Sequence, residues 1–264
     1  MDRDAIGIFD SGVGGLTVMH ELVQALPAES FIYFGDTGRY PYGNKSPETV
    51  TRYSLENAAF LVDKGIKLLV VACNAASSVA LGALAAECRV PVIGVIEPGA
   101  KAAVERTENR RVGVIGTELT IASGAYTRTL KRLRSDLEIY TRACPMFVPL
   151  AEEGWTDNEI AKATIALYLA SLAKSGIDTL ILGCTHYPLL KPSIAEFLGD
   201  GVRLVDSAEE TAREVRETLK AQALLRRRGR GATSFFVTDV PDRFIKVGRR
   251  FLGERVESAV RIER

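Results

Sequence analysis

Two cysteines stand where an apolar segment gives way to polar residues. Cys73 follows residues 67–72, and Cys184 follows residues 179–183. If each apolar segment is a strand of a parallel sheet, both thiols lie at its carboxyl edge, beside the start of the next helix. That environment lowers the pKa of a thiol and favours the reactive thiolate. His186, one of only two histidines in the chain, lies two residues beyond Cys184.

Two matched thiols suit acid–base chemistry better than acyl transfer. A nucleophilic cysteine needs one thiol, a base and an oxyanion hole. A racemase removes a proton from one face of a carbon and returns one to the other face, so it needs two matched groups. The alternative for any cysteine is ordinary core packing, which we expect for Cys88 and Cys144. The sequence has no Cys-x-x-Cys pair, so we expect no metal site.

A glycine-rich turn follows the first apolar segment. Residues 10–15 read Asp-Ser-Gly-Val-Gly-Gly, and backbone N–H groups in such a turn can hold a carboxylate. The alternative is that the turn is only a tight connection. A dinucleotide site would need a third glycine where Thr17 stands, so we exclude it.

Short apolar segments alternate with helical ones along the chain. Most are continuous in Val, Ile and Leu, which predicts strands covered on both faces, in parallel sheets with helices on both sides. The predicted strands are residues 5–9, 31–34, 67–72, 91–96, 111–115, 179–182 and 202–205. Capping patterns predict helices that start after Ser46, Thr156 and Ser207.

Two pairs of segments resemble each other. Residues 7–11 resemble residues 113–117, and residues 69–74 resemble residues 180–185. Duplication of one α/β unit would explain both pairs, while chance similarity between buried strands remains the alternative.

Composition is that of an ordinary folded protein. The 264 residues include 34 Lys and Arg against 33 Asp and Glu, which disfavours broad nucleic-acid or membrane binding. The charged residues 1–4 do not resemble a secretory signal, and no apolar stretch is long enough to span a membrane. Four widely spaced cysteines favour free thiols in a reducing cytoplasm. The basic residues 226–230 indicate a solvated linker, with an anion or nucleic-acid contact as the alternative.

Four segments together resemble the bacterial glutamate racemases, in order and over nearly the whole chain. They are residues 10–15, Pro-Tyr-Gly at 41–43, Val-Ala-Cys-Asn at 71–74 and Gly-Cys-Thr-His-Tyr-Pro at 183–188. The resemblance implies two similar flavodoxin-like parallel-sheet α/β domains related by pseudo-two-fold symmetry, with the active site in the cleft between them. Residues 1–97 and 208–264 would form the first domain, and residues 98–207 the second.

The resemblance also implies roles for individual residues. Cys73 and Cys184 would be the catalytic acid/base pair, with Asp10 assisting Cys73 and both His186 and Glu152 assisting Cys184. Substrate contacts would fall on Asp10, Ser11, Tyr42, Gly43, Asn74, Ala75, Thr185 and His186. Ala75 stands where the family usually has threonine, and one lost hydrogen bond weakens binding by about 0.5–1.5 kcal/mol.

The activity implied is cofactor-independent interconversion of L- and D-glutamate by two bases, in a homodimer that supplies D-glutamate for peptidoglycan. One alternative is a racemase of another acidic amino acid such as aspartate. Another is a regulatory or binding protein that keeps the fold, for which the basic residues 226–230 are the only hint. The resemblance disfavours dependence on pyridoxal phosphate.

Overall fold

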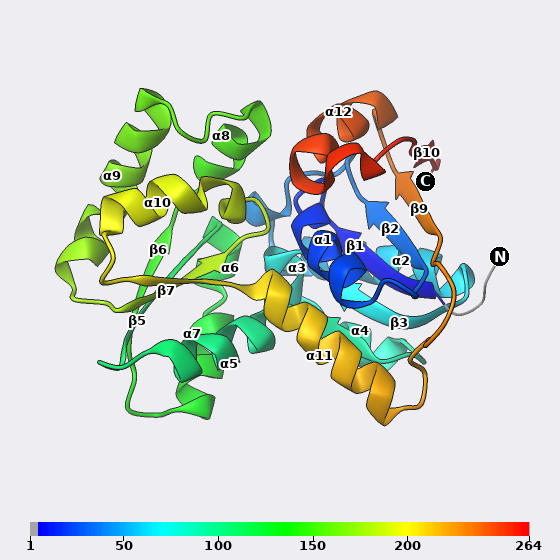
Figure 1. The fold of residues 1–264 in the computed structure, drawn as a ribbon, viewed down its shortest axis with the longest axis horizontal. Coiled ribbons are helices and arrows are strands. Elements are labelled where there is room, and N and C mark those ends of the chain that lie inside the picture. The colour runs from blue at the N-terminus through cyan, green and yellow to red at the C-terminus, as the bar shows by residue number, and fades with distance from the viewer. Residues whose placement is uncertain (1–4, 264) are drawn as a thin grey trace.

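Two parallel β-sheets lie side by side in the computed structural model, which describes residues 5–263 (Figure 1). The charged residues 1–4, on which the prediction of no signal peptide rests, lie outside the described residues. The first sheet has the order β10 (Val260–Arg261), β9 (Thr233–Val237), β2 (Phe31–Gly35), β1 (Ala5–Asp10), β3 (Ile66–Val71) and β4 (Val92–Gly94). The second has the order β6 (Glu138–Ala143), β5 (Arg111–Gly116), β7 (Thr179–Gly183) and β8 (Arg203–Asp206).

The two sheets share one strand order. In the first, β1 pairs in parallel with β2 and β3, and in the second β5 pairs in parallel with β6 and β7. The repeated segments 7–11 and 113–117 fall on β1 and β5 and the turns that follow them. The structure therefore favours two copies of one unit over chance similarity. The first sheet is then extended beyond β2 by β9 and β10, from the C-terminal part of the chain.

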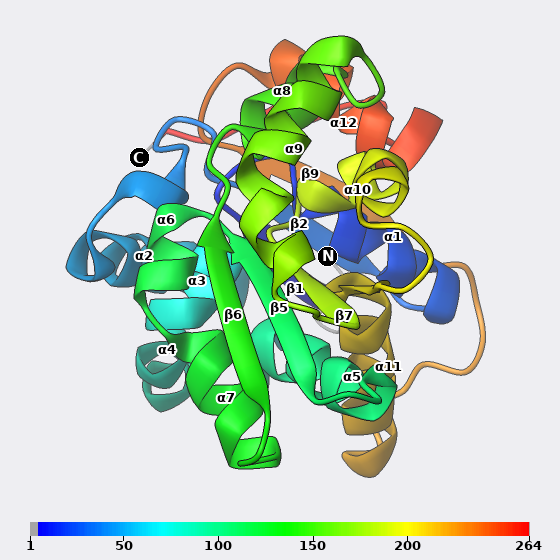
Figure 2. The same cartoon turned by 90° about the vertical axis from the view of Figure 1, so that its left-hand side faces the viewer.

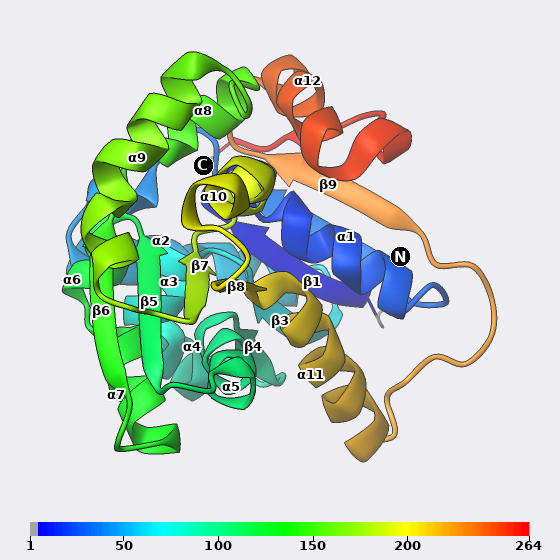
Figure 3. The ribbon, with the colours of Figure 1, turned by 60° about the vertical axis from the view of Figure 1, so that its left-hand side comes forward.

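Helices cover both faces of each sheet, as the continuous apolar strands predict (Figures 2 and 3). One face of the first sheet packs against α1 (Leu16–Ala25), α11 (Ser207–Ala221) and α12 (Pro241–Leu252). Its other face packs against α2 (Pro47–Asp63), α3 (Asn74–Val79) and α4 (Leu81–Glu87). In the second sheet one face packs against α8 (Phe147–Glu153), α9 (Glu159–Lys174) and α10 (Lys191–Leu198), and the other against α5 (Ile96–Arg106) and α7 (Ala125–Leu133).

Short elements complete the connections at the carboxyl ends of the strands. They are α6 (Glu118–Ala122), which follows β5, and the 3₁₀ turns η1 (Tyr42–Asn44) and η2 (Tyr187–Leu190), whereas a third turn, η3 (Gly253–Arg255), lies between α12 and β10. Within residues 5–263 no helix combines the length and the apolarity that crossing a membrane requires.

Several predicted boundaries are wrong for identifiable reasons. The segment 91–96 holds only the short strand β4, and its last residue already begins α5. Strand β6 lies at the edge of its sheet with no fully buried residue, so it lacked the apolar run that marks the other strands. Ser46 caps α2 as predicted, because its side chain accepts from the Thr49 N–H. The other two predicted caps are displaced: Asn158 caps α9, and Asp206 caps α11.

The displaced cap gives a stability test far from the cavity described below. The Asn158 side chain accepts a 2.9 Å hydrogen bond from the Ala161 N–H, so Asn158→Ala leaves a helix donor without it. We expect the free energy of unfolding to fall by about 1 kcal/mol. Urea denaturation of Asn158→Ala beside Thr156→Ala measures the difference. If Thr156→Ala lowers the free energy of unfolding as much or more, Thr156 caps the helix, as the sequence predicted.

Candidate active site

One small cavity lies between the carboxyl ends of the two sheets, and both predicted catalytic cysteines line it. Its volume is about 30 Å³, enough for one or two water molecules. The other predicted residues that line it are Ser11, Tyr42, Gly43, Asn74, Ala75, Thr185 and His186. Asp10 and Glu152 do not line this cavity, and Glu152 lines a neighbouring one that shares Tyr40 with it.

The glycine turn of the first sheet packs directly on Thr185 and His186 of the second half. A Cβ at Gly14 would lie 2.5 Å from the His186 Nδ1 and would also overlap the Thr185 side chain. Thr17, one turn further along, donates to the Thr185 carbonyl at 3.1 Å. The turn is therefore a close contact between the two halves as well as a candidate cradle, and Gly14 is required for that approach.

Cys73 is buried close to the carboxyl group of Asp10. It follows β3 at the start of α3, is buried, and its Sγ donates to the Ser11 Oγ at 3.7 Å. Burial, and next the charge of Asp10, raise the pKa of Cys73 to about 12, although hydrogen bonds from the Ala76 backbone and Ser11 oppose them. The prediction that the helix N-terminus lowers this pKa is therefore wrong, because desolvation outweighs it.

Asp10 stands behind the turn that carries Ser11. It is fully buried at the end of β1, and its Oδ2 accepts the Gly12 N–H at 2.8 Å. Among the described residues its Oδ1 has no hydrogen-bond partner. Burial raises the pKa of Asp10, while the charge of His186 opposes that shift.

Cys184 has a charged neighbour instead. Its Sγ lies 3.8 Å from the His186 Nδ1, and the other ring nitrogen of His186 lies 3.1 Å from the Glu152 Oε1. Burial lowers the pKa of His186, but hydrogen bonds to Cys184 and Glu152, together with their charges, outweigh burial and raise it to about 10. An imidazolium between a carboxylate and a sulfur places positive charge beside Cys184 at neutral pH.

The remaining predicted residues contribute in different ways. The Asn74 Oδ1 accepts from the Tyr126 hydroxyl at 2.7 Å. The Tyr42 hydroxyl is bonded to buried Asp36, and Tyr42 and Gly43 both line the cavity. Gly43 also packs closely on Thr117, since a Cβ there would lie 2.5 Å from the Thr117 Cβ.

Five lining residues were not predicted, namely Tyr40, Pro41, Thr117, Thr120 and Val148. Thr117 could have been found, because it occupies in the second repeat the position that Ser11 occupies in the first. Pro41 belongs to the Pro-Tyr-Gly segment quoted above, and no sequence pattern marked the other three.

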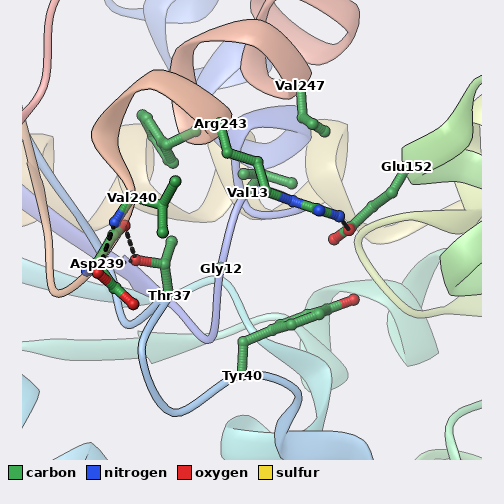
Figure 4. Close-up of a pocket in the computed structure, with 10 residues that line it drawn as sticks. Gly12, Val13, Thr37, Tyr40, Glu152, Asp239, Val240, Arg243 and Val247 are labelled. Atoms are coloured by element: carbon green, nitrogen blue, oxygen red, sulfur yellow. Dashed lines mark hydrogen bonds and ion pairs between the residues drawn. The ribbon is translucent and has the colours of Figure 1, made fainter.

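A second cavity, of about 130 Å³, lies beyond Tyr40, which lines both cavities (Figure 4). Figure 4 shows Arg243 of α12 reaching Glu152 of α8, and the Arg243 Nη2 lies 3.4 Å from the Glu152 Oε2. Arg250 of the same helix donates to the Glu152 backbone carbonyl. Helix α12 of the first half thus contacts α8 of the second half beside His186.

Two further sequence features can now be placed. The part of the chain that the structure describes contains no group of three His, Cys, Asp or Glu side chains arranged to hold a metal ion. The basic residues 226–230 run before β9, where Arg226 donates to the Glu29 carboxylate and to Ser30. They therefore lie beside the start of β2, at the amino ends of the strands, whereas the cavity lies at the carboxyl ends.

Comparison with known proteins gives consistent matches. The profile of the family described as Asp/Glu/Hydantoin racemase matches residues 6–215. A glutamate racemase from Geobacter metallireducens is 62% identical over 257 residues, which cover 97% of this chain and 95% of that protein. A glutamate racemase isoform from Bacillus anthracis superposes with a TM-score of 0.96 at 41% identity, covering 100% and 98% of the two chains.

Two other solved structures bear on the substrate. A glutamate racemase from Francisella tularensis in complex with D-glutamate superposes with a TM-score of 0.93 at 36% identity, covering 100% of this chain and 98% of that one. An aspartate racemase homologue from Pyrococcus horikoshii reaches a TM-score of 0.60 at 20% identity, over 82% and 99% of the two chains. That second likeness shows a shared fold alone.

The Gly14 contact predicts a strong effect of one methyl group. In Gly14→Ala the new Cβ overlaps His186 and Thr185, so we expect at least a 100-fold loss of kcat/KM, on the order expected when catalytic groups are misplaced. Gly82→Ala is the matched control: Gly82 lies in α4, where a Cβ would meet no other atom within 4 Å, and the change should stabilise by about 0.5–1 kcal/mol. Activity of Gly14→Ala close to that of Gly82→Ala would contradict the role of this contact.

The raised pKa of His186 predicts a pH-dependent stability. Because the folded-state pKa lies near 10 and the ordinary value is 6.5, the stabilisation is complete below about pH 6.5 and disappears as the pH rises through about 10. We expect the stability difference between the wild type and His186→Asn to shrink over that range, as measured by urea unfolding at several pH values. Two curves that run parallel from pH 6.5 to 10 would refute the shift.

Proposed function

The chain belongs to the Asp/Glu/hydantoin racemase family, and we propose on that premise that it interconverts L- and D-glutamate by a two-base mechanism without a cofactor. The observation that carries the mechanism is that Cys73 and Cys184, from corresponding positions in the two repeats, line one cavity. Aspartate is not favoured, because no feature of the cavity points to it and the aspartate racemase homologue shares only the fold.

The two cysteines differ in their surroundings. Cys184 lies 3.8 Å from the His186 ring, whereas burial and the charge of Asp10 raise the pKa of Cys73 and keep that residue a thiol. In one direction the Cys184 thiolate takes the α-proton from one face of glutamate, and the Cys73 S–H gives its proton to the opposite face of the carbanion-like carbon. The reverse direction begins after the protons have redistributed.

Supporting residues hold the charges that this chemistry needs. Glu152 keeps His186 protonated and oriented through the 3.1 Å contact to its outer nitrogen. Asp10 holds the turn that presents Ser11 to Cys73, through its bond from the Gly12 N–H. Polar groups of Ser11, Asn74 and Thr185 are suited to the α-carboxylate and ammonium, where fixed donors stabilise the developing charge.

The cavity is too small for an amino acid of glutamate's size, so we infer that the two halves separate to admit it. Contacts of α12 with α8, through Arg243 and Arg250 to Glu152, would break and re-form as they do so. The halves that move are the proposed domains, residues 1–97 with 208–264 and residues 98–207.

In the cell we propose a cytoplasmic homodimer that supplies D-glutamate for peptidoglycan. Four unpaired cysteines support a reducing compartment. A second copy is supported by large apolar side chains exposed around α8 and α9, above all Leu167 at 76% exposure. These include Met146, Trp155 and Ile160.

Isotope exchange in D₂O tests the reaction. Each enantiomer of glutamate should lose optical activity and gain one α-deuterium, followed by circular dichroism and mass spectrometry. Cys73→Ala and Cys184→Ala should each lower racemisation about 10²–10⁴-fold, the usual contribution of one acid or base.

The control for these variants is Cys88→Ala, a half-buried cysteine that does not line the cavity. It should retain wild-type rates. Absence of α-exchange from both enantiomers in the wild-type protein would refute the proposed reaction. Retention of full activity by either catalytic variant would refute the two-base mechanism alone.

A further inference from the structure

Tyr126 is a buried residue at the seam of the two halves that no motif marked. It is the second residue of α7, and it is only 2% exposed. Its ring lies against Gly183, where a Cβ would come within 3.0 Å of the Tyr126 Cε2. Gly183 immediately precedes Cys184, so the ring supports the end of the strand that carries this cysteine.

The hydroxyl of Tyr126 reaches across to the other half. It donates to the Asn74 Oδ1 at 2.7 Å, and Asn74 immediately follows Cys73. The Ser207 side chain lies at the same hydroxyl, and its hydrogen bond opposes the rise in the Tyr126 pKa that burial causes. A chain of bonds therefore runs from Ser207, where the polypeptide returns to the first half, through Tyr126 to Asn74.

This chain fixes which way the Asn74 amide faces. With its Oδ1 occupied, the amide cannot rotate by half a turn without losing the bond from Tyr126. Asn74 lines the cavity, and its Nδ2 is buried with no hydrogen-bond partner among the described residues. A buried donor without a partner is costly, so this group is set to gain an acceptor when an anion enters the cavity.

We propose that Tyr126 is a positioning residue for substrate binding: its hydroxyl holds the Asn74 amide so that the Nδ2 donates to a carboxylate of the bound amino acid. The role rests on the proposed function, because glutamate is the ligand that supplies the carboxylate. The hydrogen bond from Tyr126 to Asn74 joins the two halves, so it exists only when they are closed. The Asn74 amide is therefore oriented for binding only in the closed arrangement.

Tyr126→Phe removes the hydroxyl and keeps the ring on Gly183. We expect KM for both enantiomers to rise about tenfold while kcat changes less than about threefold, since the lost contact serves binding. In an Asn74→Ala background, Tyr126→Phe should have no further effect on KM. A merely structural role would give additive effects, because it would act whether or not the amide is present.

Tyr187→Phe is the matched control. Tyr187 is also buried in the second half, and its hydroxyl donates to the Cys144 carbonyl at 2.8 Å, away from Asn74. Its effect should add to that of Asn74→Ala. Should Tyr126→Phe fail to fold, Ser207→Ala removes the outer hydroxyl of the chain, and its smaller rise in KM should likewise vanish in Asn74→Ala.

The outcomes separate the two proposals. A wild-type protein that does not racemise glutamate overturns the proposed function, and the role of Tyr126 with it. An active wild type with an unchanged KM in Tyr126→Phe, or with additive effects of Tyr126→Phe and Asn74→Ala, overturns the role of Tyr126 alone.

Discussion

The direct contact between the glycine turn of the first half and residues 185–186 of the second is the constraint on which the site depends. Parallel strands end at one edge of each sheet, but two such edges form a shared cavity only if they come close. At Gly14 the backbone approaches His186 without room for a methyl group. Beneath the turn, buried Tyr33 donates to the Gly12 carbonyl at 2.9 Å and holds it in place.

The repeated unit places the two cysteines in equivalent positions, while the ionisable residues around each cysteine differ between the copies. Both copies place a cysteine after the third strand of the unit, yet the turns beside them differ. The first copy has a buried carboxylate, Asp10, where the second has Gly116, and the second adds the pair of His186 and Glu152. As a result, Cys184 lies beside the protonated His186, whereas burial and Asp10 oppose the ionisation of Cys73.

The features that the sequence could predict are those encoded by residues close together in the chain. Strands buried on both faces are continuous in apolar residues, and the cysteines sit at their ends, so the fold class and the two sulfurs were accessible. Strand β6 was missed because an exposed edge carries no such run. Tyr126 and Arg243 were missed because their partners lie 52 and 91 residues away, and only tertiary packing brings such groups together. The pKa of Cys73 was predicted in the wrong direction because burial depends on the whole fold.

Because β9 extends the first sheet, the two sheets are completed at different times during synthesis. All four strands of the second sheet lie within residues 111–206, so that sheet can form as soon as this stretch has left the ribosome. The first sheet cannot finish then, because the outer edge of β2 has no partner until residues 233–237 arrive. The half that begins the chain therefore completes its sheet last, and its open strand is the part of the nascent protein most prone to pairing with another chain.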